Sequence, residues 1–262
     1  MWSLCCKGID KENETSAHCY WNKITSVLSS IDSEYNERTD KNTVDADKNL
    51  LKNRFLCDFE DEVFYNYIYA FVRYGLMDFK IGKDHVRLSF KNDQIRMCLT
   101  KAGLILELKT YLICSELLSS QRGDCLTGVT IDWDGEDDLS SDIKYLYDDD
   151  DPSSAIDTTN EIDVLANFGL LPYFISCKNG KFTSEELYKL YSVSERFGKG
   201  YGVKIIVAAC LENSLGAARK TILQRAADMG IIIVDNVNRL TDDEFSSALR
   251  KAMELPNKVV SY

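Results

Sequence analysis

The sequence predicts an α/β fold in which a mixed β-sheet is flanked by helices on both faces. An apolar run at 203–210 is typical of a buried central strand, the segment 230–237 predicts another, and a helical pattern lies between them. Two further strand patterns, at 161–168 and 171–178, are separated only by Gly169-Leu170, which indicates a tight hairpin. A hairpin joined to strands that alternate with helices predicts a sheet with both kinds of strand pairing.

The patterning divides the chain into three regions. Residues 1–55 are polar and poorly patterned, apart from a short amphipathic stretch at 21–28 that is a candidate helix. An exposed loop is expected after that stretch. Residues 56–100 predict a small winged-helix-like region, and residues 101–262 hold the larger α/β domain.

The winged-helix-like region is predicted from a helix followed by a hairpin. Apolar side chains recur at helical spacing from 58 to 75, where Gly75 ends the pattern. Residues 79–90 then form two short alternating runs around Gly82-Lys83-Asp84, which indicates a β-hairpin. An alternative stays open, in which the helix and the hairpin simply pack against the next domain.

Apolar spacing and capping signals place the helices of the larger domain. One long helix is expected over 94–120, and it carries a single conspicuous acid, Glu107, among apolar neighbours. Two capping boxes, Thr183 to Glu186 and Thr241 to Glu244, predict helices that extend to about residues 197 and 253. The remaining expected elements are a strand and a helix, at 126–133 and 215–228.

Charge and composition limit the class of protein. The formal net charge is −11, but ten acids and one lysine between Asp132 and Asp151 give −9, so the rest of the chain carries only −2 and a polyanionic substrate is not excluded. Nine scattered cysteines without a CxxC pair, and only two histidines, argue against a zinc site. The odd cysteine count, with no secretory signal, predicts reduced thiols in a cytoplasm. No apolar run approaches membrane-spanning length.

Charged residues on the predicted hairpin point to chemistry. Glu161 and Asp163 share one face of the first strand, and Ser176 and Lys178 share one face of the second. Because the hairpin is short, an acid and a lysine can meet at one point. This combination suits phosphodiester hydrolysis assisted by Mg²⁺ or Mn²⁺, in which carboxylates hold the metal and the lysine stabilises charge. The spacing fits equally well a purely structural ion pair between Asp163 and Lys178.

Several runs in order resemble one known domain. The segment from Lys101 to about Met253, a little over half of the chain, resembles the PD-(D/E)xK nuclease domain of CRISPR-ancillary, CARF-linked endonucleases. The matching runs are Lys101-Ala102-Gly103 with Leu106-Glu107, Gly128-Val129-Thr130-Ile131-Asp132-Trp133-Asp134, Asn160-Glu161-Ile162-Asp163-Val164, Phe174-Ile175-Ser176-Cys177-Lys178-Asn179-Gly180, Glu186-Leu187-Tyr188-Lys189-Leu190, Glu195-Arg196-Phe197-Gly198 and Gln224-Arg225-Ala226-Ala227-Asp228-Met229-Gly230-Ile231.

The resemblance implies roles for particular residues. Asp163 would bind Mg²⁺ or Mn²⁺, and Lys178 would be the catalytic lysine. The backbone carbonyl of Cys177 would be a further metal ligand, Glu107 would contribute a second carboxylate, and Glu161 would assist. Two helical arginines, Arg196 and Arg225, would contact nucleic-acid phosphates; the competing interpretation is that they are ordinary surface or ion-pair residues.

The same resemblance implies the biological setting. It predicts a cytoplasmic, homodimeric endonuclease that cuts single-stranded DNA, RNA or both in prokaryotic antiviral defence. Two features depart from the family pattern. Ser176 stands where the pattern has an acid, and only about 55 residues precede the winged-helix-like region, so most or all of the CARF sensor domain is predicted to be absent. Activation by a cyclic oligoadenylate is therefore not carried over to any residue.

Two competing functions are kept. The first is a nuclease fold that has lost catalysis, with Ser176 as the marker, and that only binds nucleic acid or a protein partner. The second is an enzyme that uses Cys177 as a nucleophile, although no histidine lies near it in the sequence.

Overall fold

A computed structural model of the chain describes residues 25, 28–29, 42–47, 62–101, 103–119, 123–132, 159–179, 182–209, 211 and 218–254. The chain divides into two compact units, Met1–Lys109 and Thr110–Tyr262, and each is described by itself. Within the described residues, no helix has the length and apolar character needed to cross a bilayer.

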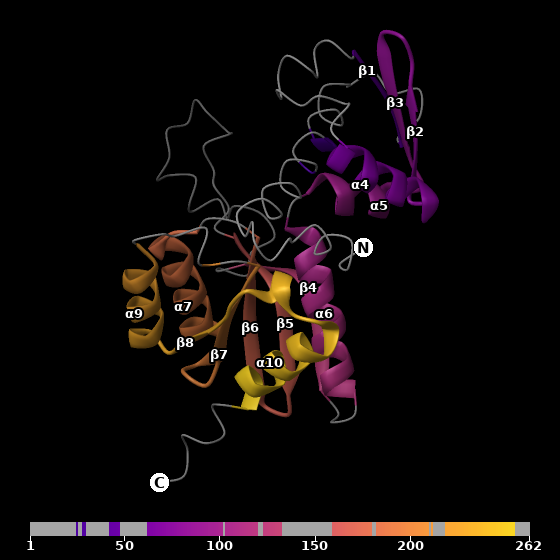
Figure 1. Cartoon of the computed structure of the whole chain (residues 1–262). Coiled ribbons are helices and arrows are strands. Elements are labelled where there is room, and N and C mark those ends of the chain that lie inside the picture. The colour runs from indigo at the N-terminus through magenta and orange to yellow at the C-terminus, as the bar shows by residue number, and fades with distance from the viewer. Residues whose placement is uncertain are drawn as a thin grey trace, which may run out of the picture. The chain divides into compact units, whose positions relative to one another are not determined.

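The first unit holds a three-stranded antiparallel sheet in the order β1-β3-β2 (Figure 1). The hairpin predicted at 79–90 is present as β2 (Met77–Ile81) and β3 (His85–Phe90). Val86, Leu88 and Phe90 are buried along one face of β3, as the period of two requires.

The helix predicted before this hairpin is α4 (Glu62–Arg73). It ends where Gly75 takes a φ of +64°, and the amide of Leu76 donates back to the carbonyl of Phe71 at 2.9 Å. Glycine adopts this left-handed conformation at little cost, which is why the helix stops here. The predicted residues before Glu62, and most of the candidate helix at 21–28, lie outside the described residues.

The prediction of a loop before α4 is wrong at residues 43–47. These residues form β1 (Thr43–Asp47), which pairs antiparallel with β3. Across this pair, Arg87 binds the carboxylate of Asp45 at 2.7 Å. The short polar run TVDAD has no strong strand pattern of its own, and it becomes a strand because β3 offers a free edge some 40 residues later.

The prediction of a single helix over 94–120 is also wrong, because the structure has two helices in this segment. Helix α5 (Asp93–Thr100) begins at Asn92, whose side chain accepts the amide of Ile95. Its C-cap, Lys101, is extended, with φ −100° and ψ 114°. Helix α6 (Leu104–Ser119) then begins with amides that donate to the carbonyl of Gly103. The division between the two units falls inside α6, after Lys109.

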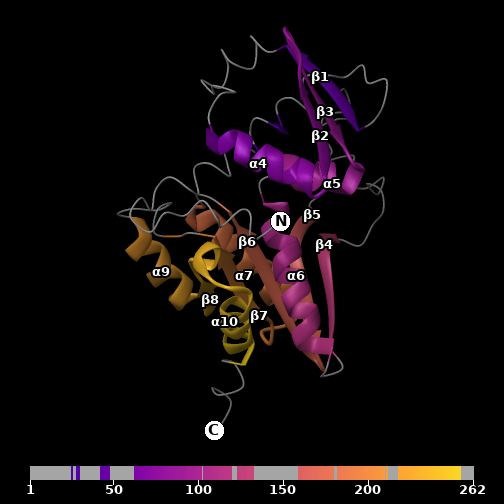
Figure 2. The ribbon, with the colours of Figure 1, turned by 45° about the vertical axis from the view of Figure 1, so that its right-hand side comes forward.

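The second unit is built on a five-stranded mixed sheet in the order β4-β5-β6-β7-β8 (Figures 1 and 2). The first three strands pair antiparallel, and the last three pair parallel. The mixed sheet predicted from the sequence is therefore confirmed. The strand bounds are β4 (Asp124–Asp132), β5 (Thr159–Phe168), β6 (Leu171–Lys178), β7 (Val203–Ala208) and β8 (Ile231–Val234).

Helices cover both faces of this sheet. Helices α7 (Ser184–Gly198) and α9 (Arg219–Asp228) pack on the face that carries Phe174 and Ile206. The opposite face carries Tyr173, whose hydroxyl donates to the carbonyl of Met253 at 3.2 Å. Met253 belongs to α10 (Asp242–Glu254), which follows the short 3₁₀ helix η4 (Val237–Arg239). All six residues of β7 are buried, as its largely apolar sequence predicts, and they include Lys204.

The hairpin between β5 and β6 sets up the region described next. Gly169 has a φ of +62° in the turn. The ladder runs from the pair Phe168–Leu171 to the pair Val164–Ile175, where it ends. Asp163 is the next residue of β5 after that last pair.

Candidate active site

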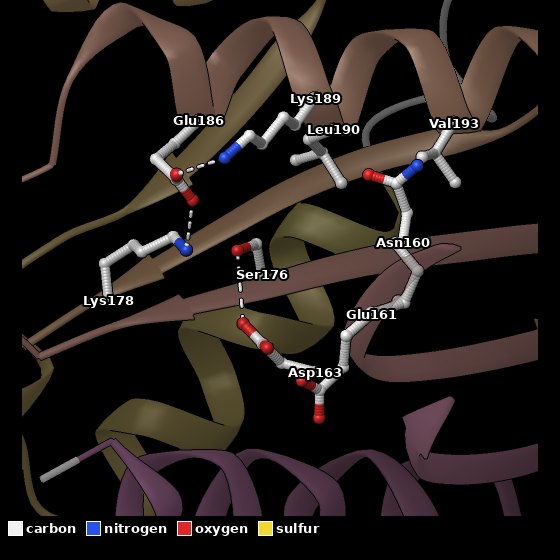
Figure 3. A pocket seen from close by; sticks show the side chains of 10 residues that line it. Asn160, Glu161, Asp163, Ser176, Lys178, Glu186, Lys189, Leu190 and Val193 are labelled. Carbon is white, nitrogen blue, oxygen red and sulfur yellow. Dashed lines mark hydrogen bonds and ion pairs between the residues drawn. The ribbon is translucent and has the colours of Figure 1, made fainter. Parts of the chain in front are cut away.

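A pocket of about 390 Å³ opens where the β5–β6 ladder ends. In Figure 3, Lys178 is directed to Glu186, and Ser176 is directed to Asp163. Strands β5 and β6 contribute Asn160, Glu161, Ile162, Asp163, Ser176 and Lys178. Helix α7 contributes Glu186, Lys189, Leu190 and Val193. The hairpin thus brings the predicted acid and lysine to one pocket.

The carboxylate of Asp163 fills the gap between the diverging strands. Its Oδ2 accepts the backbone amide of Cys177 at 2.5 Å and the hydroxyl of Ser176 at 3.1 Å. Both bonds use the same oxygen. A carboxylate oxygen can accept more than one hydrogen bond, so Oδ1 keeps its capacity to bind a further partner.

The electrostatics of Asp163 are dominated by burial. Loss of solvent raises the pKa of this carboxyl above its usual value, and the nearby negative charge of Glu161 acts in the same direction. The hydrogen bonds from Cys177 and Ser176 and the positive charge of Lys178 oppose the shift without cancelling it. A carboxylate in such a place gains from any additional positive charge.

The backbone of Cys177 faces Asp163, whereas its side chain faces the other way. The carbonyl of Lys178 accepts the amide of Ala209 on the β7 side. Because backbone groups alternate along a strand, the carbonyl of Cys177, like its amide, is directed to the side of Asp163. The thiol is buried, with Sγ 3.5 Å from the hydroxyl of Thr110 on α6. This geometry does not favour Cys177 as a nucleophile in the pocket.

The amine of Lys178 is paired with a residue that the sequence analysis did not assign to the site. Its Nζ lies 2.6 Å from Oε2 of Glu186, and the two side chains are 22% and 29% exposed. The other oxygen of Glu186 lies 3.4 Å from Nζ of Lys189. The lysine therefore meets a carboxylate from α7, while Asp163 is bonded to Ser176 and Cys177.

Glu186 was interpreted from the sequence as the third residue of a capping box. Thr183 is indeed the N-cap of α7, but its side chain makes no capping hydrogen bond. At the other predicted box the reciprocal bonds are present, between Thr241 and Glu244 at 2.8 and 3.3 Å. Helical spacing offers one signal that could have identified Glu186, because it shares a helix face with Lys189, Leu190 and Val193, all of which line the pocket.

The pKa of Glu186 lies below its ordinary value. Burial alone would raise it, but the hydrogen bond and charge of Lys178, together with the charge of Lys189, outweigh burial. The carboxylate of Glu186 therefore stays ionised to lower pH than a free glutamate, whereas Asp163 holds its proton to higher pH than a free aspartate. The two acids of one pocket are shifted in opposite directions by their surroundings.

The other predicted residues are placed as follows. Glu161 is exposed at the rim of the pocket, on the same strand as Asp163. Glu107 is half-buried in the part of α6 that belongs to the first unit, so its role as a second carboxylate stays a prediction. Arg196 is exposed near the end of α7, and its guanidinium lies 6.0 Å from the ring centre of Phe197. Arg225 on α9 donates to the hydroxyl of Ser184 at the start of α7.

The donor set near Asp163 fits a hard divalent cation that keeps most of its water. Among the described residues, no three histidine, cysteine, aspartate or glutamate side chains converge as a metal-binding group. Mg²⁺, however, is commonly held through one or two carboxylates, with water completing its octahedron. The Asp163 carboxylate and the Cys177 carbonyl are oxygen donors on one side of the gap, with Glu161 beside them.

Comparisons with known proteins show the fold. No family model matches the sequence, and no curated protein sequence matches it. The similar solved structures include protein VC1899 from Vibrio cholerae, with a TM-score of 0.60, and Can2 from Sulfobacillus thermosulfidooxidans in complex with cyclic tetra-adenylate, with a TM-score of 0.51, each at 15% identity. The matches cover 96% and 91% of this chain, respectively. The chain spans only 54% of either matched protein.

Proposed function

We propose that this chain is a metal-dependent endonuclease of the PD-(D/E)xK class that hydrolyses phosphodiester bonds in CRISPR-associated antiviral defence. The observation that carries the proposal is the convergence of Asp163 and Lys178 on one pocket at the end of the β5–β6 ladder, where the Cys177 amide donates to Asp163. The fold shared with Can2, together with the sequence resemblance, supports the CRISPR setting. In the same proposal, the sheet and helices of the first unit are a winged-helix-like module.

Each residue has a defined task in this proposal. The Asp163 carboxylate and the Cys177 carbonyl would hold Mg²⁺ or Mn²⁺, with Glu161 in support. Lys178 carries three N–H donors and gives one to Glu186, so two are left to orient the attacking water and to bind a phosphate oxygen. Its positive charge offsets the negative charge that grows on the phosphate in the transition state.

The divalent metal, when bound, would polarise the phosphate and lower the pKa of a bound water. Burial of Asp163 suits this role, since a carboxylate that is costly to ionise alone gains from a cation beside it. Ser176 fills the place of the pattern's second acid by donating to Asp163, so the nearest further carboxylate on β5 is Glu161. Homodimerisation and the choice between DNA and RNA follow from the resemblance alone and stay predictions.

A cleavage assay tests the proposal. The purified chain is incubated with labelled single-stranded DNA, single-stranded RNA and nicked or supercoiled plasmid, with Mg²⁺, Mn²⁺ or EDTA. Asp163→Asn and Lys178→Ala should each lower cleavage at least about 100-fold, to a small residual rate. Lys204→Ala is the matched control, because Lys204 also projects from a strand of this sheet to a glutamate of α7, at 2.7 Å from Glu195. The proposal fails if wild type cuts nothing with either metal, or if the two site variants cut like wild type.

One observation favours a second function. Ser176 supplies a hydroxyl where the family pattern has an acid, so the site offers fewer carboxylates than a typical nuclease of this class. In a binding module without catalysis, wild type and Asp163→Asn would bind the labelled strands equally well and neither would cut.

Activity that resists iodoacetamide and is lost with EDTA would separately exclude a cysteine nucleophile.

A further inference from the structure

The long, flexible side chain of Lys178 does not by itself hold the amine at one point. A lysine ammonium stands on a four-carbon chain with large rotamer freedom, and this freedom must be lost before the amine can act at one point. Lys178 is the last residue of β6, so its backbone is fixed by the sheet while its amine is not. A partner on a second rigid element would fix the amine.

Glu186 lies on such an element. It belongs to the first turn of α7, next to Leu187, which is fully buried and anchors that turn in the core. Its carboxylate is held from both sides, by Lys178 at 2.6 Å on Oε2 and by Lys189 at 3.4 Å on Oε1 (Figure 3). Less than a third of either side chain in the Lys178–Glu186 pair is exposed, so the contact is shielded from solvent screening.

The residues around Lys178 on the sheet make other contacts, and its direct partner comes from helix α7. Ser176, two residues before Lys178 on the same strand face, is neutral and donates to Asp163. The Asp163 carboxylate in turn accepts from Ser176 and from the Cys177 amide through Oδ2. Glu186 is the anion that contacts the amine directly.

We propose that Glu186 is a positioning residue for Lys178, holding the ammonium at the pocket so that its remaining donors face the scissile phosphate and the attacking water. This inference rests on the proposed function. It adds a residue that acts through Lys178 and that has no assigned role in the sequence-based site. Glu186 touches neither the metal ligand Asp163 nor the Cys177 backbone in the described contacts.

The chain contains a matched pair that separates positioning from stability. Lys204 on β7 and Glu195 on the same helix α7 lie 2.7 Å apart, with side chains 10% and 38% exposed. The two pairs thus share geometry, chemistry and supporting helix. Neither Lys204 nor Glu195 lines the pocket. Truncating Glu195 should therefore perturb the fold in a comparable way without affecting the reaction.

The test is a double-mutant cycle on cleavage rates. The single-turnover rate and KM are measured for wild type, Glu186→Ala, Lys178→Ala and the double variant, with Glu195→Ala as control. Glu186→Ala should lower the rate about 10- to 100-fold while KM changes little, because a misplaced catalytic group weakens the transition state more than substrate binding. In the Lys178→Ala background the same change should have less than about a twofold effect.

Two further readouts address structure directly. Glu186→Gln keeps an oxygen acceptor for the amine and should recover most of the rate lost in Glu186→Ala. Acetylation of individual lysines, followed by mass spectrometry without metal or substrate, should show faster labelling of Lys178 in Glu186→Ala and unchanged labelling of Lys178 in Glu195→Ala.

The outcomes are distinct. An active wild type whose Glu186→Ala variant cuts at the same rate, or whose two substitutions act additively, overturns the inference and leaves the proposed nuclease standing. Unchanged labelling of Lys178 in Glu186→Ala also overturns it. An inactive wild type overturns the proposed function and this inference together.

Discussion

The amide of Cys177 and the carboxylate of Asp163 lie 2.5 Å apart at the point where their two strands stop pairing. Within a regular ladder this amide would have met a backbone carbonyl of β5. Here the side chain of Asp163 takes that place, so the acid is bound to the strand that carries Lys178.

Asp163→Asn should separate catalysis from folding. The amide keeps an oxygen that can accept from Cys177 and Ser176, but it carries no charge for a divalent cation. Cleavage should fall at least about 100-fold. Burial raises the pKa of Asp163, so its charged form costs stability at neutral pH, and the variant should melt no lower than wild type at pH 7. A lower melting temperature in differential scanning calorimetry would contradict this account of the carboxyl.

The pH dependence of cleavage should report the same carboxyl. Because its pKa is raised from the ordinary 3.8, activity should be lost on acidification at a pH above 3.8. Glu161 contributes to the raised pKa through its charge, so Glu161→Gln should move the acidic limb of the profile to lower pH. The measurement is kcat/KM against pH for both proteins, at a metal concentration well below saturation, so that the profile follows the metal-free carboxyl. If the acidic limb of the Glu161→Gln profile stays in place or moves to higher pH, the charge of Glu161 does not raise the pKa of Asp163.

Metal binding should depend on Asp163 more than on Glu161. Isothermal titration calorimetry with Mn²⁺ should give a heat of binding for wild type that Asp163→Asn removes. Glu161→Gln should weaken the affinity by a smaller factor, because Glu161 is an exposed side chain beside the donors. Lys204→Ala serves as the control, since its ion pair lies elsewhere on the sheet. Equal binding by wild type and Asp163→Asn would place the metal at another site.

The Lys204–Glu195 pair should respond asymmetrically to truncation. Lys204 is buried, and its amine lies 5.0 Å from the ring centre of Tyr191. Glu195→Ala leaves a buried ammonium without its partner and should cost about 1–3 kcal/mol. Lys204→Met keeps most of the packing and frees Glu195 to meet water, so it should cost less than about 1 kcal/mol. Urea denaturation of both variants checks the order.

The two predicted capping boxes should differ in strength. Thr241→Ala should destabilise the protein by about 1 kcal/mol, because Thr241 Oγ1 accepts the amide of Glu244 and the amide of Thr241 donates to the Glu244 carboxylate. Thr183→Ala should cost clearly less, because the Thr183 side chain caps nothing. Thermal melts of the two variants provide the comparison. Equal losses would show that Thr183 forms its cap in solution.

Local patterns predicted most of the elements but missed two features. The β5–β6 hairpin, the buried strand β7 and the end of α4 at Gly75 follow from alternation, apolar runs and glycine, which act over a few residues. The strand β1 was missed because its stability comes from a partner far along the chain. The break between α5 and α6 was missed because apolar spacing continues across it.

The candidate site also has one part that follows from local pattern and one part that depends on the packing of the fold. The hairpin pattern alone predicts that Asp163 and Lys178 come close, because a two-residue turn leaves adjacent strands no other register that buries their apolar faces. The pairing of Lys178 with Glu186, and of Asp163 with Ser176 and the Cys177 amide, came from the packing of the folded chain. A turn fixes the residues around it through backbone geometry alone. The partner of a long side chain depends on how a helix packs across the sheet, and that is settled by the whole core.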